Sequence, residues 1–248
     1  MSEPSGPDDR PGRESRAPGA KVRWSLGAPA FGFGTGLVVA VVAESIWITA
    51  HHGQTDSLGV VVCSTVGLWV GLGGSALYAS RTQGSGSPAT DFGLRFAWFD
   101  PLLGAPLGVA AQYVLGLVVV AAYQASGVPQ KTINNLGQPA QQVTGLAHGW
   151  GDVILVLVVV VGAPVIEELF FRGLLLRALK ARIGSVGAVI ASGVLFGLAH
   201  FEPLQLPVLA LFGVVLGMVA LRTGRLGPGI CAHAAFNSLA VYSLLSSR

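Results

Sequence analysis

Charged residues are scarce in this chain of 248 amino acids. Lys, Arg, Asp and Glu make up 11% of it, hydrophobic residues make up 52%, and the mean hydropathy is +0.64. Soluble domains carry about 25% charged residues, so the composition excludes a single water-soluble fold and indicates an integral membrane protein. The chain has only two cysteines, Cys63 and Cys231, and both lie in apolar runs. A disulfide-stabilised scaffold is therefore excluded.

Basic clusters interleaved with aromatic residues are also missing, so nucleic acid is not an expected partner. The net charge of +3 is better explained by orientation in the bilayer. If the N-terminal tail is cytoplasmic, the tail and loops on that side hold twelve Lys and Arg residues against two outside. This distribution predicts a cytoplasmic N-terminus, an external C-terminus and a location in the plasma membrane.

Long runs of alternating polar and apolar residues are absent, which excludes a transmembrane barrel. Seven apolar stretches instead have the length that a helix needs to cross the hydrocarbon core. The predicted fold is all-α, a polytopic transmembrane bundle of about seven spans in which internal glycines let helices approach closely. The predicted spans are Gly27–Ala50, Leu58–Ser80, Pro101–Gln124, Gly151–Leu169, Ile183–Phe201, Leu204–Leu221 and Pro228–Leu245.

The remaining segments divide the chain into a tail and a membrane domain. Residues 1–26 are rich in Pro, Gly and charge at their start and predict a disordered cytoplasmic tail, whereas residues 27–248 form the transmembrane domain. The Gly- and Ser-rich stretch 81–91 predicts a flexible linker, and residues 92–100, which mix aromatics with Arg95, an interfacial helix. We expect an irregular outer loop over residues 125–150.

Ionisable groups inside apolar spans are energetically expensive, so each suggests a functional role. Glu167, Glu168 and Arg172 follow the apolar run 153–166. Glu168 and Arg172 are four residues apart and share a helix face, which allows an ion pair. Glu167 is rotated by about 100° and has no such partner in its own helix. It is free to take a proton from water and return it.

Two histidines and an asparagine extend this polar group. His200 follows Phe196 by four residues, and His233 and Asn237 are four apart on another span, so each pair shares a helix face. A single buried histidine is more often a satisfied core residue than a catalyst. Polar groups on three membrane helices favour a shared site, although neutral polar packing or a proton path is the competing interpretation.

The polar group permits two mechanisms for adding water to a carbonyl. In one, Glu167 and His200 activate a water directly, while His233 and Asn237 stabilise the oxyanion. In the other, Glu167, His200 and His233 are candidate ligands of a divalent metal such as zinc, which would activate the water. The compact zinc motif HExxH is absent. A serine nucleophile is less favoured, because no G-x-S-x-G elbow surrounds a serine.

Three patterns occur in order on successive apolar segments: Glu167-Glu168-x-x-x-Arg172, Phe196-x-x-x-His200 and His233-x-x-x-Asn237. Together, over about residues 101–245, they resemble the signature of the CPBP intramembrane proteases, also called the Abi or CAAX protease family. The resemblance implies that Glu167 activates water, supported by Glu168 and Arg172. It likewise implies that His200 is the partner for the water and that His233 and Asn237 bind the oxyanion.

By this resemblance the chain is an intramembrane endopeptidase that cuts a peptide or protein substrate near the cytoplasmic face. The family includes prenyl-protein endopeptidases and relatives linked to bacteriocin maturation or immunity, and its motif is compatible with metal-free or metal-dependent catalysis. The alternatives are a non-catalytic membrane immunity or binding protein, and a proton-coupled transporter. The transporter is less favoured because no inverted repeat is evident.

The predicted spans place the polar residues at unequal depths. Glu167 lies about 24 Å of helix rise from Gly151, and His233 lies about one turn from Pro228, so both fall towards the cytoplasmic side. His200, counted from Ile183, falls near the outer end of its span. A shared, cytoplasm-facing cavity therefore requires that this helix begins deeper, tilts, or bends at one of its glycines.

Overall fold

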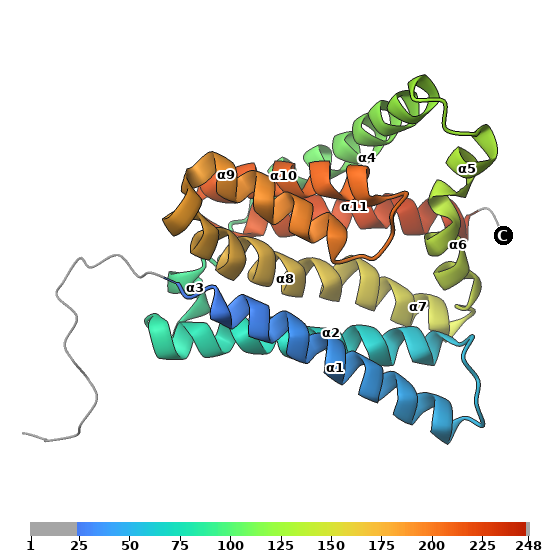
Figure 1. The fold of residues 1–248 in the computed structure, drawn as a ribbon, viewed down its shortest axis with the longest axis horizontal. Helices are drawn as coiled ribbons and strands as arrows, with labels where there is room; N and C mark the ends of the chain where they lie inside the picture. The colour runs from blue at the N-terminus through green and yellow to red at the C-terminus, as the bar shows by residue number, and fades with distance from the viewer. Residues whose placement is uncertain (1–23, 247–248) are drawn as a thin grey trace, which may run out of the picture.

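A computed structural model describes residues 24–246, and these residues form a bundle of helices with no strand (Figure 1). The predicted all-α fold is therefore confirmed for this part of the chain. Most of the predicted tail, residues 1–23, lies outside the described residues; Trp24 is buried and its ring packs against Phe92. The elements are α1 (Gly27–Ala50), α2 (Leu58–Gln83), α3 (Pro88–Asp91), α4 (Asp100–Ala125), α5 (Gln130–Asn134), η1 (Asn135–Gly137), α6 (Gln138–Gly145), α7 (Trp150–Val156), η2 (Leu157–Gly162), α8 (Ala163–Glu167), η3 (Glu168–Leu175), α9 (Leu176–Leu198), α10 (Leu206–Thr223) and α11 (Gly227–Leu245).

Five helices within residues 24–246 are long and apolar enough to cross a membrane: α1, α2, α4, the continuous run Trp150–Leu198, and α10. The run Trp150–Leu198 contains two of the seven predicted spans, because the chain breaks helical geometry at Gly184. The seventh, α11, has 19 residues and carries the polar His233 and Asn237. The predicted seven segments are thus all helical.

The central helical run is longer than the predicted span Gly151–Leu169. It continues through α7, η2, α8, η3 and the first part of α9 to Ile183. The predicted span ended too early at Leu169, because the helix continues past it and Arg172 is buried within the bundle. Arg, Leu, Ala and Lys, which dominate this stretch, are all strong helix formers.

Three helix pairs surround the central run. Helix α1 packs along α2, α4 along α11, and α10 along α9, while the central run contacts both α2 and α11. A Cβ added to Gly71 of α2 would collide with the backbone of Gly32 in α1, which confirms that glycines permit close helix contact here. The bundle thus holds the central run between α2 and α11.

The connections are more ordered than expected. Helix α2 continues to Gln83, and the Asp91 carboxylate accepts hydrogen bonds from the Ser80 hydroxyl (2.6 Å) and the Ser85 N–H (2.9 Å). The stretch 81–91 is therefore a folded turn, not a flexible linker. The outer stretch 125–150 contains α5, η1 and α6 and was wrongly expected to be irregular.

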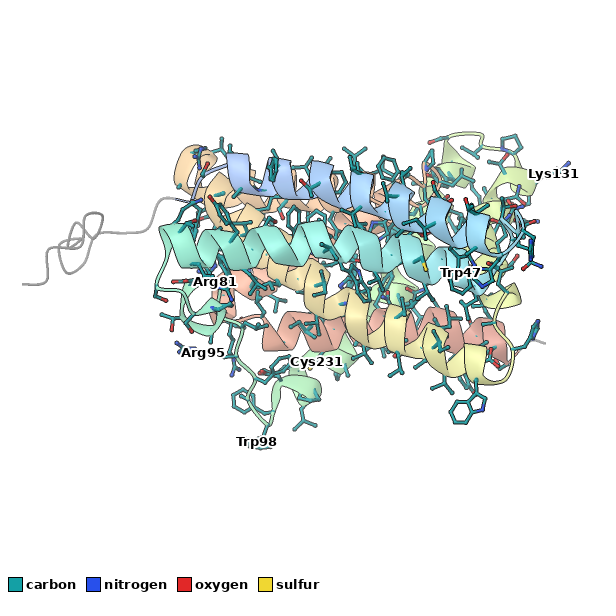
Figure 2. The ribbon with its side chains drawn as sticks, turned by 90° about the horizontal axis from the view of Figure 1, so that it is seen from below. Trp47, Arg81, Arg95, Trp98, Lys131 and Cys231 are labelled. Carbon is teal, nitrogen blue, oxygen red and sulfur yellow. The ribbon has the colours of Figure 1, made fainter. Side chains whose placement is uncertain are left out.

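The predicted interfacial helix over residues 92–100 was also wrong. Residues 92–99 form an irregular loop, and Gly93 has φ = +71°, in the left-handed region that breaks a helix. Figure 2 shows Arg81 and Arg95 at the end of the bundle near this loop and Lys131 at the opposite end. These three basic residues thus lie at opposite ends of the bundle, and the orientation in the membrane stays a prediction.

Candidate active site

The reversal of the chain at Gly184 brings Glu167 and His200 to the same depth. Gly184 has φ = +73°, which favours glycine. Glu167 lies 17 residues before Gly184 and His200 lies 16 residues after it. At about 1.5 Å per residue, both lie some 25 Å from the turn. The sequence predicted unequal depths for Glu167 and His200 because the central span was taken to end at Leu169, whereas the helix continues to the turn at Gly184.

Glu168 and Arg172 form the predicted ion pair. Arg172 Nη1 lies 2.9 Å from Glu168 Oε1, and neither side chain is exposed. Arg172 Nη2 also donates a hydrogen bond to the carbonyl of Gly213 in α10 (3.1 Å). An ion pair so enclosed limits the desolvation cost of both charges. It joins the central run to α10 and leaves Glu168 poorly placed to reach a substrate.

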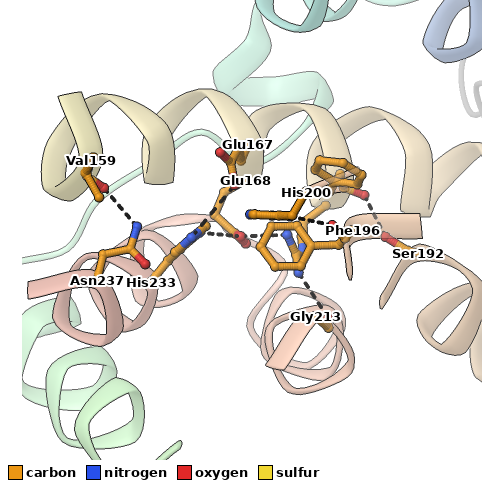
Figure 3. Close-up of polar contacts among 11 residues, drawn as sticks. Val159, Glu167, Glu168, Ser192, Phe196, His200, Gly213, His233 and Asn237 are labelled. Carbon is orange, nitrogen blue, oxygen red and sulfur yellow. Dashed lines mark hydrogen bonds and ion pairs between the residues drawn. The ribbon is translucent and has the colours of Figure 1, made fainter. Parts of the chain in front are cut away.

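Glu167 differs from its neighbour in exposure. Its side chain is 17% exposed, whereas that of Glu168 is fully buried. Glu167 Oε2 faces His233 Nε2 of α11 at 3.8 Å, and Glu168 Oε1 lies 3.4 Å from His233 Nδ1. His233 therefore lies between the two carboxylates, as Figure 3 shows. Of the two glutamates, only Glu167 combines this position with access.

The buried ring of Phe196 is the centre around which the polar residues gather. The rings of His200 and His233 lie 4.8 and 5.5 Å from it, each edge to face, and the Arg172 guanidinium lies 4.4 Å from its centroid. The face of an aromatic ring carries partial negative charge, which attracts a guanidinium. Phe196 thus positions residues from three different segments, and the structure brings together all five predicted residues other than Asn237.

His200 has a defined hydrogen-bonding state. Its Nδ1 lies 2.8 Å from the carbonyl oxygen of Phe196. A carbonyl can only accept a hydrogen bond, so Nδ1 is the donor in this contact, and the tautomer that satisfies it has its lone pair on Nε2. His200 can therefore accept a hydrogen bond from water at Nε2 while its backbone contact fixes the ring.

Asn237 contacts the central run instead of the other polar residues. Its Nδ2 donates a hydrogen bond to the carbonyl of Val159 in the π-helical turn η2 (2.8 Å). In a π-helix this carbonyl would accept from residue 164, which is Pro164 and has no N–H. Asn237 supplies the missing donor. One of its two amide hydrogens remains for another acceptor.

Two π-helical turns, η2 and η3, flank Glu167 and were not predicted from the sequence. Such turns are rare and are frequent at functional sites. The signal for η2 was Pro164, which cannot donate within the helix. Ser192 was also missed as part of this region: its buried hydroxyl donates to the carbonyl of Phe171 in η3 (3.1 Å) and holds the two arms of the reversal together.

Among residues 24–246, no three His, Cys, Asp or Glu side chains are grouped so that they could hold a metal ion. Glu167, His200 and His233, the candidate ligands, are not grouped as a ligand set would be.

An apolar cavity of about 520 Å³ is lined by residues of α1, η3 and α9 and by none of the six predicted site residues. Phe171 and Ala199, the neighbours of Arg172 and His200 in the chain, form part of its wall, and residues of α1 close the other side. The wall is almost entirely apolar, which is typical of a pocket for an apolar group.

A family model described as "Type II CAAX prenyl endopeptidase Rce1-like" matches residues 149–239. The matched region contains all six predicted site residues and the whole reversal at Gly184. No curated protein and no solved structure matches the chain.

Proposed function

Because residues 149–239 match a family model of type II CAAX prenyl endopeptidases, we propose that this chain belongs to the CAAX protease family and is an intramembrane endopeptidase in which Glu167 and His200 activate a water. One observation carries the proposal. Glu167 is the partly exposed carboxylate that faces His233 of a second helix, while the adjacent Glu168 is buried in an ion pair with Arg172.

In the proposed reaction, His200 Nε2 accepts a hydrogen bond from a water and Glu167 takes its proton. The water oxygen attacks the carbonyl carbon of the scissile peptide bond and forms a tetrahedral oxyanion. Protonated Glu167 then returns the proton to the leaving nitrogen as the C–N bond breaks. The products are a carboxylic acid and an amine, so atoms and protons balance.

The oxyanion would be stabilised from α11. His233 presents Nε2 on the side that faces Glu167, and Asn237 has one amide hydrogen not used by Val159. Donors held in place before the reaction stabilise the developing charge without reorganising. The buried pair of Glu168 and Arg172 would keep the ring of His233 in position from its other side.

The apolar cavity supports a substrate with an apolar part near the cleaved bond. Its wall includes Ala199, directly before His200 in the chain, and an apolar group of the substrate would bind there while the peptide extends towards His200. A prenylated C-terminal peptide of the CAAX type is the first substrate to test, given the description of the matching family. We further propose that cleavage occurs near the cytoplasmic face of the plasma membrane.

The test is peptide cleavage by the purified protein in lipid nanodiscs, with products identified by mass spectrometry. Glu167→Gln should lower kcat about 10²-fold or more, the range expected for loss of a general base. Glu44→Gln is the matched control, because it removes a different carboxylate from a predicted span, in α1, and should leave kcat unchanged. Equal activity of Glu167→Gln and wild type would remove Glu167 from the mechanism and favour a binding role.

A further inference from the structure

The loop between α3 and α4 displays two aromatic side chains away from the bundle. Phe96 is 59% exposed and Trp98 is 83% exposed. Figure 2 shows Trp98 projecting beyond the helices at the end of the bundle that also carries Arg81 and Arg95. Exposed aromatic residues on a loop are energetically unfavourable in water, so this arrangement requires an explanation.

The loop is firmly braced, so its exposed aromatics are held in place. The Leu226 N–H donates to the carbonyl of Gly93 (2.8 Å), and Arg177 donates to the carbonyl of Phe92 (2.8 Å). At the other end of the loop, Arg225 pairs with the buried Asp100 (2.8 Å). These contacts fix both ends of the segment that carries Phe96 and Trp98.

The surroundings of these side chains match the interface of a bilayer. The loop and the short helix α3 connect α2 to α4, two helices able to cross a membrane, and the exposed Leu102 and Leu103 continue the apolar surface along the first turn of α4. Arg95 is exposed next to Phe96. Trp with neighbouring apolar and basic residues is typical of the zone where lipid headgroups meet acyl chains.

The contacts that hold the two ends of the loop also connect it to the active site. Arg225 and Leu226 directly precede α11, and a Cβ added to Gly227 would collide with the Asp100 carboxylate. Two residues further on, Gly229 lies against Glu168, and His233 follows one turn later. The position of the loop therefore determines where α11 starts relative to the two glutamates.

We propose that Phe96 and Trp98 insert into the interfacial layer of the bilayer and that this anchor fixes the start of α11. The partner is the lipid surface itself, and the basic Arg95 favours phosphate groups of the lipid headgroups. The link from the anchor to catalysis rests on the function proposed above. The insertion of the loop into the bilayer is independent of that function.

Trp98 fluorescence tests the insertion directly. The protein is placed in phosphatidylcholine nanodiscs whose acyl chains carry bromine near the headgroup or near the chain end, and the Trp98 signal is the difference between wild type and Trp98→Phe. We expect the headgroup-proximal bromines to quench this signal about twofold more than the distal ones, as for an interfacial Trp. The proposal would be overturned by a Trp98 signal that bromine leaves unchanged and that aqueous iodide quenches. It would also be overturned if bromine quenched the Trp98 signal only when two copies of the protein associate.

Cleavage of the prenylated peptide in nanodiscs tests the link to α11. Trp98→Ala should lower kcat about threefold or more through loss of the interfacial anchor. Trp150→Ala is the matched control, because Trp150 is equally exposed, at 83%, but begins α7 and lies outside the loop between α3 and α4. Equal cleavage by Trp98→Ala and wild type would overturn the link. If wild type cleaves no peptide, the proposed function fails, and the fluorescence result still decides whether the loop inserts.

Discussion

Replacement of Arg172 by alanine would leave the Glu168 carboxylate buried without its partner. The pair is 2.9 Å apart with both side chains fully buried, and removing one member of such a pair costs about 3–5 kcal/mol. The substitution also removes the hydrogen bond to the Gly213 carbonyl and the contact with the Phe196 ring. For a chain of this size we expect the midpoint of thermal unfolding to fall by about 6–20 °C.

Thermal unfolding of the purified variants in one detergent measures this effect. Lys180→Ala, which removes an exposed positive charge from the same helical run, is the control and should change the stability by less than about 0.5 kcal/mol. The double variant Glu168→Gln/Arg172→Met removes both charges and should be more stable than Arg172→Ala, because no unpaired charge remains buried. Equal melting temperatures for Arg172→Ala and Lys180→Ala would refute the buried-pair reasoning.

Three other substitutions test close contacts at the site and in the α2–α3 turn. Gly229→Ala would place a methyl group 3.0 Å from a carboxylate oxygen of the buried Glu168 and should destabilise the protein by about 1–3 kcal/mol. Gly74→Ala is the control, because a Cβ there meets open space, and it should not destabilise the protein. Equal melting temperatures for the two variants would contradict the contact. Asn237→Ala leaves a π-turn carbonyl without a donor and should cost about 1–3 kcal/mol, more than Ser238→Ala, whose hydroxyl bonds within its own helix; the reverse order would count against this brace. Burial alone would raise the pKa of Asp91, but hydrogen bonds from serine hydroxyl and backbone groups outweigh it and hold the pKa below its usual 3.8. The ionised form therefore stabilises the fold above the usual pKa, and the stability difference between wild type and Asp91→Asn should shrink as the pH falls below 3.8; a difference independent of pH would contradict this assignment.

Hydropathy and spacing were sufficient to predict the helical class and the grouping of most polar residues. The ion pair of Glu168 and Arg172 follows from their separation by four residues, since one helix turn places them on the same face. The meeting of His200 with His233 depends on tertiary packing around Phe196, and the sequence indicated it only through the combination of motifs.

The depth of the site could not be predicted from hydropathy. Polar residues such as Arg172 lowered the hydropathy after Leu169 and suggested that the membrane span ends there, yet the Arg172 side chain is buried in contacts that single-residue scales ignore. The true reversal is at Gly184, where a positive φ is required. The π-helical turns likewise depend on a donor from another helix, Asn237, which the spacing of residues along one helix does not reveal.

The central claim is that Glu167 and His200, from the two arms of the reversal, act on the same water. A double-mutant cycle on peptide cleavage measures this most directly, with kcat determined for Glu167→Gln, His200→Ala and the combined variant. Residues that act as a unit show strongly non-additive losses, so the combined variant should be no more than about twofold slower than the slower single variant. Losses that multiply would show that the two residues act independently, and would contradict the shared site.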